Sequence, residues 1–222
     1  MDPGRGTGSG APVGVVRERF PPKLSDKGSE LIFRFRCALP VMTLVIRDYR
    51  PTDRAAVIGC LDAMHEAMVP LDPWRRVVRQ PSHGKLFVRE VLQRVRQDRG
   101  FILVAQVDGE TAGIAVAWQV RFSPARRTTE LPTRVGYLSD LSVLAKWRGK
   151  GIGTRLLHET EQRFRRDGCD QMSLGVFFPN QKAQQLYFRN GFTRRGMILG
   201  KRLGPPRKNW PRDTGPRRKR SS

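Results

Sequence analysis

A glycine-rich stretch, WRGKGIG, at residues 147–153 has a composition suited to binding an anion. Three of its seven residues are glycines, and Arg148 and Lys150 add two positive charges. Glycine lets the backbone turn several N–H groups toward one point, and free N–H groups at the start of a helix attract an anion. Because an apolar run precedes the stretch and an amphipathic run follows it, we predict a strand-to-helix turn that binds a phosphate or pyrophosphate.

Two familiar phosphate-binding patterns do not fit this stretch. A Walker-type P-loop needs four residues between its first glycine and a Gly-Lys-Ser/Thr sequence, and GKGIGT lacks that spacing. The dinucleotide pattern G-x-G-x-x-G requires a glycine at the position of Thr154. On local sequence alone, a purely structural tight turn therefore remains the alternative.

A second motif, NQKAQQLYFRNGF, follows about thirty residues later at 180–192. Its Asn180, Ala183 and Tyr187 are spaced by three and four residues, so a helix places them on one face. An R-x-x-G-x-G sequence at Arg148–Gly153, joined to N-x-x-A-x-x-L-Y-x-x-x-G-F at this distance, resembles the GNAT superfamily of acyl-CoA-dependent N-acetyltransferases. The resemblance covers residues 42–202.

The resemblance implies acetyl-CoA as co-substrate and assigns its binding residues. The backbone at 141–143 would bond the pantetheine arm, and the Val143 N–H would face the thioester carbonyl. Arg148 and the amides of 149–154 would hold the pyrophosphate, and Asn180 and Ala183 would line the other side. In chain order, the implied cofactor-binding residues are Leu141, Ser142, Val143, Arg148, Gly149, Lys150, Gly151, Ile152, Gly153, Thr154, Asn180, Ala183 and Tyr187.

The resemblance also implies three catalytic residues. Tyr187 would donate a proton to the departing thiolate, although a packing tyrosine is the alternative, and Asn180 could simply cap its helix. Several family members carry Glu within Y-L-E-D on the central strand, whereas this chain reads YLSD, with Ser139 at the Glu position and Asp140 matching the Asp.

The general base is therefore open between these two residues. Strand alternation predicts Ser139 and Asp140 on opposite faces of the sheet; Ser139 could hold a water that carries the proton, and Asp140 could be structural. Glu66, His65 and His83 are further candidates for the base, from the helical region that frames the acceptor in the family.

Alternating hydrophobic patterns predict the elements that must position these residues. Helices are expected at 51–68, with Thr52 or Asp53 near the N-cap, and at 84–98, 153–167 and 180–190. The helix at 51–68 has an apolar stripe of Ala56, Cys60, Met64 and Ala67, and the helix at 84–98 has one of Leu86, Val88, Val91, Leu92 and Val95. Strands are expected at 43–49, 101–107, 111–120, 135–145, 171–178 and 193–203.

The order of these elements defines the fold class. Strand, helix and strand in the second half imply a parallel strand pair joined by a right-handed helix crossover, and the first half implies an antiparallel meander. We predict a single α/β domain of GNAT type with a mixed, mostly antiparallel sheet.

Charge and composition suggest how the rest of the chain is organised. The net charge is +22, and residues 201–222 hold nine basic residues and one acidic residue. We expect a domain at 42–204, a partly disordered extension at 1–41 whose segment 30–41 could add a strand, and a disordered basic Pro-rich tail at 205–222. The tail could contact nucleic acid or another acidic partner, or simply aid solubility.

The compartment is predicted from two absences. No apolar stretch approaches the ~20 residues that span a bilayer, so no membrane partner is expected. No secretory signal is recognisable, and the three cysteines show no metal-ligand spacing; this pattern predicts reduced thiols in a cytoplasmic protein without a metal site.

The function predicted first is acetyl transfer from acetyl-CoA to a primary amine by direct attack in a ternary complex. The acceptor, a small amine or a protein Lys or N-terminus, is left open, and so is a homodimer. The alternative is a non-catalytic acyl-CoA-binding module whose basic tail engages nucleic acid or the ribosome, and the missing Glu at Ser139 is its best support. An outright nucleic-acid-binding protein is a weaker third hypothesis, because no aromatic-interleaved basic pattern is present.

Overall fold

The computed structural model describes residues 42–123, 133–201 and 203 of the 222 residues. The predicted strand at 30–41 and the basic tail at 205–222 lie outside them, and the domain boundaries remain predictions. The chain divides into two compact units. The first contains the residues up to Met64 together with Ser82–Gly175, and the second contains His65–Pro81 and the residues from Val176 onward.

A five-stranded mixed sheet forms the first unit, and it confirms the predicted α/β fold class. Its strands lie in sequence order, with antiparallel neighbours except for the last pair, which is parallel. Helix α4 (Ile152–Arg166) makes the crossover between the parallel strands. The strands are β1 (Leu44–Asp48), β2 (Phe101–Val107), β3 (Glu110–Gln119), β4 (Val135–Val143) and β5 (Gln171–Leu174).

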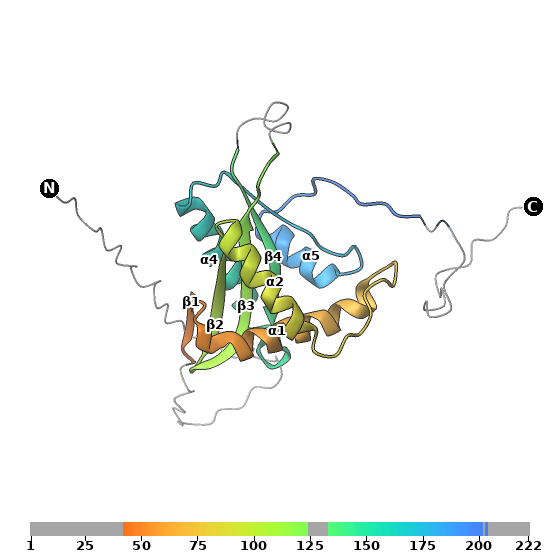
Figure 1. The fold of residues 1–222 in the computed structure, drawn as a ribbon. Coiled ribbons are helices and arrows are strands. Elements are labelled where there is room, and N and C mark those ends of the chain that lie inside the picture. The colour runs from red at the N-terminus through yellow and green to blue at the C-terminus, as the bar shows by residue number, and fades with distance from the viewer. Residues whose placement is uncertain (1–41, 124–132, 202, 204–222) are drawn as a thin grey trace, which may run out of the picture. The chain divides into compact units, whose positions relative to one another are not determined.

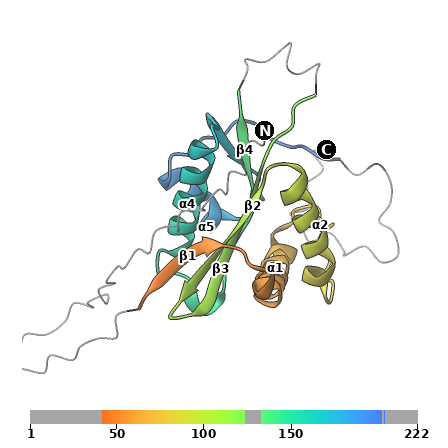
Figure 2. The ribbon, with the colours of Figure 1, turned by 60° about the vertical axis from the view of Figure 1, so that its left-hand side comes forward.

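Helices cover both faces of this sheet (Figures 1 and 2). Helices α1 (Arg54–Met68) and α2 (His83–Gln97) pack on one face, and α4 packs on the other. On the α4 side, a Cβ at Gly136 would lie 2.5 Å from the Phe164 ring, so only glycine allows this close approach. The core between α1, α2 and the sheet consists of Val57, Cys60, Leu61, Val88, Val91, Ile102, Val104, Ile114 and Val116.

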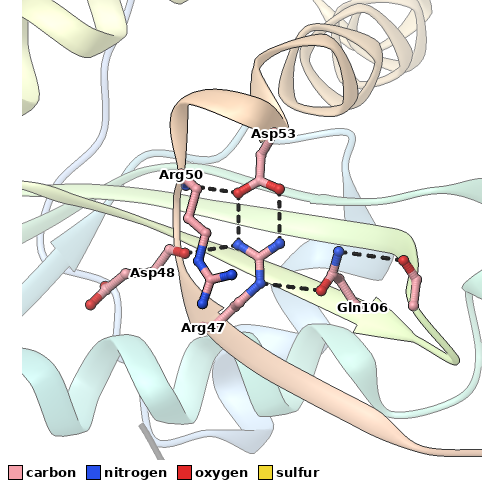
Figure 3. A network of polar contacts seen from close by, with 6 residues as sticks. Arg47, Asp48, Arg50, Asp53 and Gln106 are labelled. Atoms are coloured by element: carbon pink, nitrogen blue, oxygen red, sulfur yellow. Dashed lines mark hydrogen bonds and ion pairs between the residues drawn. The ribbon is translucent and has the colours of Figure 1, made fainter. Parts of the chain in front are cut away.

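A polar network fixes the chain where β1 passes into α1 (Figure 3). The Arg47 guanidinium donates two hydrogen bonds to the Asp53 carboxylate, at 2.7 and 2.8 Å, and its Nε donates to Gln106 on β2. Asp53 also accepts from the Arg50 backbone N–H at 2.7 Å, which closes the short 3-10 turn Pro51–Asp53 that precedes α1. The predicted cap residue Asp53 therefore acts within this turn, one step before the α-helix begins.

Two sets of predicted positions differ from the structure. Leu86 and Ala67 do not belong to the buried stripes of their helices: the Leu86 side chain is 58% exposed, and Ala67 is exposed too. The buried residues of α1 are Val57, Cys60 and Leu61, so Cys60 of the predicted stripe is confirmed. The side chains that pack against the sheet determine how each helix is rotated about its own axis. A small or isolated apolar residue does not determine this rotation.

The predicted last strand is wrong over its described residues, 193–201, which form no strand. In this segment Met197, Ile198 and Leu199 are 78–87% exposed. The predicted strand at 171–178 is also shorter, because β5 ends at Leu174. An apolar run becomes a strand only where a neighbouring strand takes its backbone hydrogen bonds, and local sequence cannot supply that neighbour.

Candidate functional site

A β-bulge in β4 organises the candidate site. Val116 of β3 pairs with Asp140 and Ala117 pairs with Leu138, so Ser139 is an extra residue without a partner on β3. Bulges bend a strand and re-aim its side chains. The bulge interrupts the regular alternation at Ser139, and the Ser139 side chain lies close enough to Asp140 to favour its charged form.

Asp140 faces the side of the sheet that α1 and α2 cover. Its neighbour two residues on, Ser142, is also buried and donates a hydrogen bond from its hydroxyl to the Cys60 carbonyl oxygen of α1 at 2.9 Å. Because β4 is paired regularly with β3 from Asp140 to Val143, residues 140 and 142 share one face.

The Asp140 carboxyl group is suited to accept a proton. Asp140 is 5% exposed, and its Oδ2 atom is buried without a hydrogen-bond partner among the described residues. Burial raises the pKa of this carboxyl group, and the hydrogen bond with Ser139 opposes that rise. A carboxylate with a raised pKa is a stronger base than an exposed one, which is the property expected of a general base.

Beyond the bulge, β4 has an open edge. Its parallel pairing with β5 ends at Leu138 and Leu174, whereas β4 continues to Val143. The Leu144 N–H donates to Ala112 on β3 at 2.9 Å, so strand alternation directs the backbone groups of Ser142 to β3 and those of Leu141 and Val143 to the open edge. On this edge the Val143 carbonyl accepts from Arg148 Nε at 2.9 Å.

This open edge leads into the glycine-rich turn. Gly149 and Gly151 have φ angles of 76° and 78°, in the left-handed region that favours glycine. Helix α4 begins at Ile152, with Gly151 at its N-cap and no side-chain cap, and its first backbone hydrogen bond is from the Arg155 N–H to the Gly151 carbonyl.

The turn therefore presents a row of backbone donors. The N–H groups of Ile152, Gly153 and Thr154 have no acceptor within α4 and, with the helix dipole, form a site for an anion. The side chain of Lys150 lies over the Trp147 ring, with 4.6 Å from Nζ to the ring centroid. Along the chain, the open edge of β4 is thus followed directly by a short, positively charged turn.

The second motif lies on α5 (Gln181–Arg189) in the second unit. Asn180 is the N-cap of α5, because its side chain accepts from the Ala183 N–H at 3.2 Å, which confirms the capping alternative. Ala183 and Tyr187 are half-buried on this helix, and the Tyr187 ring lies 5.8 Å from the Phe192 ring. The roles of these residues toward a cofactor remain predictions.

The three further candidates for the base are engaged elsewhere. The Glu66 carboxylate pairs with Arg79 at 2.9 Å. His65 Nε2 lies 2.9 Å from the Val78 carbonyl oxygen, and the His83 ring stacks on Phe87 with 5.1 Å between centroids.

Tyr137, the first residue of the YLSD motif, and Trp118, which no motif indicated, lie beside the bulge. The centroids of their rings are 5.7 Å apart. The Tyr137 hydroxyl lies close to Gly175, where an added Cβ would be 3.5 Å from its oxygen. Burial and the nearby charge of Asp140 raise the pKa of Tyr137. The sequence places only Tyr137 near Asp140, three residues before it. Trp118 comes close to both residues only because β3 pairs with β4.

The described part of the chain has neither a metal-binding cluster nor a membrane-spanning helix. Its His, Cys, Asp and Glu side chains form no group of three that could hold a metal ion. Among the same residues, the helices are too short or too polar to cross a membrane.

Comparison with known proteins agrees with this arrangement. A family model described as the acetyltransferase (GNAT) family matches residues 64–192. Two curated relatives are uncharacterized N-acetyltransferases of Bacillus subtilis. YhfO is 28% identical over 127 residues, 57% of this chain and 81% of that protein. YycN is 32% identical over 74 residues, 33% of this chain and 47% of that protein, so the match spans about half of its length.

Solved structures share the fold. A point mutant of the BH1408 protein from Bacillus halodurans has a TM-score of 0.60 and 21% identity, covering 72% of this chain and 99% of that one. A predicted acetyltransferase from Clostridium acetobutylicum, solved with acetyl-CoA, has a TM-score of 0.55 and 16% identity, covering 72% of this chain and 97% of that one.

Proposed function

This chain belongs to the acetyltransferase (GNAT) family, and from that premise we propose that it transfers an acetyl group from acetyl-CoA to a primary amine. One observation carries the proposal: an open strand edge, with the backbone of Leu141 and Val143 directed outward, runs into a turn of unpaired amides at the start of α4. An extended pantetheine arm suits the edge, and a pyrophosphate suits the turn. The solved relative from Clostridium acetobutylicum holds acetyl-CoA.

We propose Asp140 as the general base. A primary amine with an ordinary pKa of about 10.4 is protonated at neutral pH, so a proton must leave before the nitrogen can attack. The free Oδ2 of Asp140 accepts this proton, and Ser139 holds the carboxyl group from its other side. The amine nitrogen then bonds to the thioester carbonyl carbon and loses its second proton to water, and the carbon–sulfur bond breaks as the amide forms.

The remaining groups stabilise charge. The Val143 N–H is directed to the open edge, where it can donate to the carbonyl oxygen as negative charge develops there. The departing thiolate takes a proton from the Tyr187 hydroxyl, the role that the family resemblance assigns to this residue. The amide and free CoA leave, and Asp140 and Tyr187 exchange protons with water to restore the starting state.

Release of thiol from acetyl-CoA in the presence of a mixed panel of amines tests this function. The panel contains small monoamines, diamines, an aminoglycoside and Lys-containing peptides with free or blocked N-termini. We expect release that depends on both protein and amine, with an acetylated amine seen by mass spectrometry. Tight CoA binding without release toward any of these amines would contradict the enzyme.

A second candidate is the non-catalytic acyl-CoA-binding module, which Ser139 favours because it replaces the Glu of related sequences. In this proposal the basic tail engages nucleic acid, drawn by the nine basic residues of 201–222. Binding of the full chain to RNA and DNA over a salt series distinguishes it. A steep loss of affinity with salt, together with no thiol release, would favour the module over the enzyme.

A further inference from the structure

The position of Asp140 determines on which face of the sheet the acceptor must lie. Asp140 faces α1 and α2, as its neighbour Ser142 does through its bond to Cys60. An amine that loses a proton to Asp140 therefore approaches from this face, and the rest of the acceptor extends over it. This step rests on the proposed function.

A hollow lies on the same face, between α2 and the end of β3. Its volume is about 360 Å³. Trp118 lines it from the sheet, and Phe87, Glu90 and Arg94 line it from α2, with two glutamines nearby. The Trp118 ring links the hollow to the base, because it lies 5.7 Å from the Tyr137 ring, and Tyr137 is within the electrostatic reach of Asp140.

The lining of the hollow combines aromatic rings with one available carboxylate. Phe87 and Trp118 offer faces of negative electrostatic potential, which attract cations. Glu90 is exposed, and it takes part in no ion pair or hydrogen bond within the residues that the structure describes. Such a carboxylate is unusual in a chain with 42 basic and 20 acidic residues.

Arg94, one helical turn from Glu90, does not neutralise it. The Arg94 Nε lies 2.5 Å from the Asp98 carboxylate, which is 5% exposed. The Arg94 guanidinium also lies over the Trp118 ring, 5.6 Å from its centroid. This contact shows that Trp118 already accepts a cation on its ring, and it leaves Glu90 available for a cation from outside.

We propose that this hollow binds a second cationic group of the acceptor, so that the preferred acceptors are dibasic. One amine reaches Asp140, and the other positive charge lies against Glu90 and the two aromatic rings. A chain of methylene groups between the two charges would pass over Trp118 and Tyr137. Local charge, and not the net charge of +22, then selects the substrate.

Calorimetric titration of the CoA-loaded full-length protein tests the proposal without turnover. The probes are α,ω-diaminoalkanes of three to eight carbons and n-alkylamines of equal length. For the best length we expect the diamine to bind about 3- to 30-fold more tightly than its monoamine, as one exposed ion pair and one cation–π contact would give. Glu90→Gln should lower this ratio severalfold by removing that ion pair, and should leave only the part that the cation–π contact supplies.

Matched variants separate a site from a general charge effect. Glu159→Gln removes a carboxylate from α4, on the opposite face of the sheet, and should leave the ratio unchanged. Phe87→Leu keeps the charge but removes an aromatic ring, and should lower the ratio partly. Melting temperatures establish that each variant is folded.

Three outcomes would overturn the dibasic site: equal binding of diamine and monoamine, a preference that Glu90→Gln leaves unchanged, or no binding of either probe at millimolar concentration. The thiol-release assay tells this failure from failure of the enzyme itself. Release with monoamines and diamines alike overturns only the hollow, whereas no release with any amine contradicts the proposed function.

Discussion

At the scale of single residues, burial of the Asp140 carboxyl group lowers the stability of the fold but suits the group to accept a proton. It is buried with one oxygen unpartnered, an arrangement that disfavours its charged form. Natural proteins keep such groups chiefly where function needs them. In the proposed mechanism the acceptor approaches from the face to which this side chain, next to the bulge at Ser139, is directed.

Asp140→Asn should slow the enzyme and stabilise the fold. Loss of a general base lowers kcat by about 10²- to 10⁴-fold, while an amide of the same shape removes the buried charge. Because the folded pKa of Asp140 is raised, its stability contribution is greatest below the unfolded pKa and is lost as pH rises through the folded value, so the variant should melt at a higher temperature than the wild type at neutral pH.

The check is a thermal melt at neutral pH beside a pH profile of kcat/KM. The wild-type profile should fall as pH drops through the raised pKa of Asp140, because only the carboxylate accepts a proton. A variant with full activity would remove Asp140 from the mechanism, and one that melts lower would show that the carboxylate has a stabilising partner.

Tyr187→Phe tests whether the Tyr187 hydroxyl is the general acid, and the change should disturb the fold little. The change removes one O–H and almost no volume, and acetyl-CoA should still bind. If the hydroxyl protonates the thiolate, kcat should fall by about 10²- to 10⁴-fold, with little change in the Kd for CoA. A packing tyrosine would give kcat within about twofold of wild type where chemistry limits the rate.

At the scale of elements, the start of α4 places unpaired N–H groups beside an open strand edge. Both features arise from where backbone pairing ends: β4 loses β5 after Leu138, and α4 has no cap at Gly151. An anion bound there would satisfy donors that are otherwise left to water.

Gly153→Glu should abolish CoA binding without weakening α4. A carboxylate in the first turn suits the helix dipole, so the melting temperature should hold or rise slightly. The same charge repels a pyrophosphate at the same amides. Gly153→Ala is the uncharged control and should retain most of the affinity measured by calorimetry. Equal CoA affinity in both variants would place the pyrophosphate elsewhere.

Asp53→Asn should destabilise the junction of β1 and α1. Asp53 is 7% exposed and accepts three hydrogen bonds, two from Arg47 and one from the Arg50 N–H. Loss of the charge leaves Arg47 without its partner, and we expect about 1–3 kcal/mol less stability in urea unfolding at neutral pH.

The same carboxylate makes the junction sensitive to acid. Its hydrogen bonds with Arg47 lower the pKa of Asp53, so this stabilisation is present above the unfolded pKa and is lost as pH falls through the folded value. The difference between wild type and Asp53→Asn should therefore shrink in acid. A difference that stays constant down to low pH would show that the charge contributes nothing.

At the scale of the whole molecule, a mixed sheet covered by helices on both faces carries the strand edge, the bulge and the glycine turn together in one unit. The core that fixes it lies between α1, α2 and strands β2 and β3, away from the open edge. A sheet with an unpaired strand edge beside the glycine turn can bind an extended ligand without giving up pairing elsewhere.

Deletion of 1–41 and 205–222 should leave a folded, CoA-binding domain. The patterns of both ends lack a convincing core, and the described elements begin with β1 at Leu44. Cooperative melting and calorimetric CoA affinity, each close to those of the full chain, would support the boundaries at 42 and 204. Loss of cooperative melting on removing 1–41 alone would assign the apolar segment 30–41 to the fold.

Sequence by itself determined the elements with strong local patterns. The strand at 101–107 and the helix of α2 lie where alternation and the helical apolar stripe place them, because each is defined by residues close in the chain. The glycine turn was likewise predictable, since left-handed backbone angles and a helix start leave a local signature. Asn180 was predictable as a helix cap for the same reason, because a cap depends only on residues close in the chain.

Only the tertiary structure decided which strands meet and where their pairing stops. The bulge at Ser139 depends on the register between β3 and β4, and the open edge depends on β5 ending at Leu174. The strand predicted over 193–203 did not form in its described residues, and Leu86 is exposed to solvent, for the same reason. Hydrogen-bond partners and burial come from residues distant in the chain, so a local pattern predicts an element but not its neighbour.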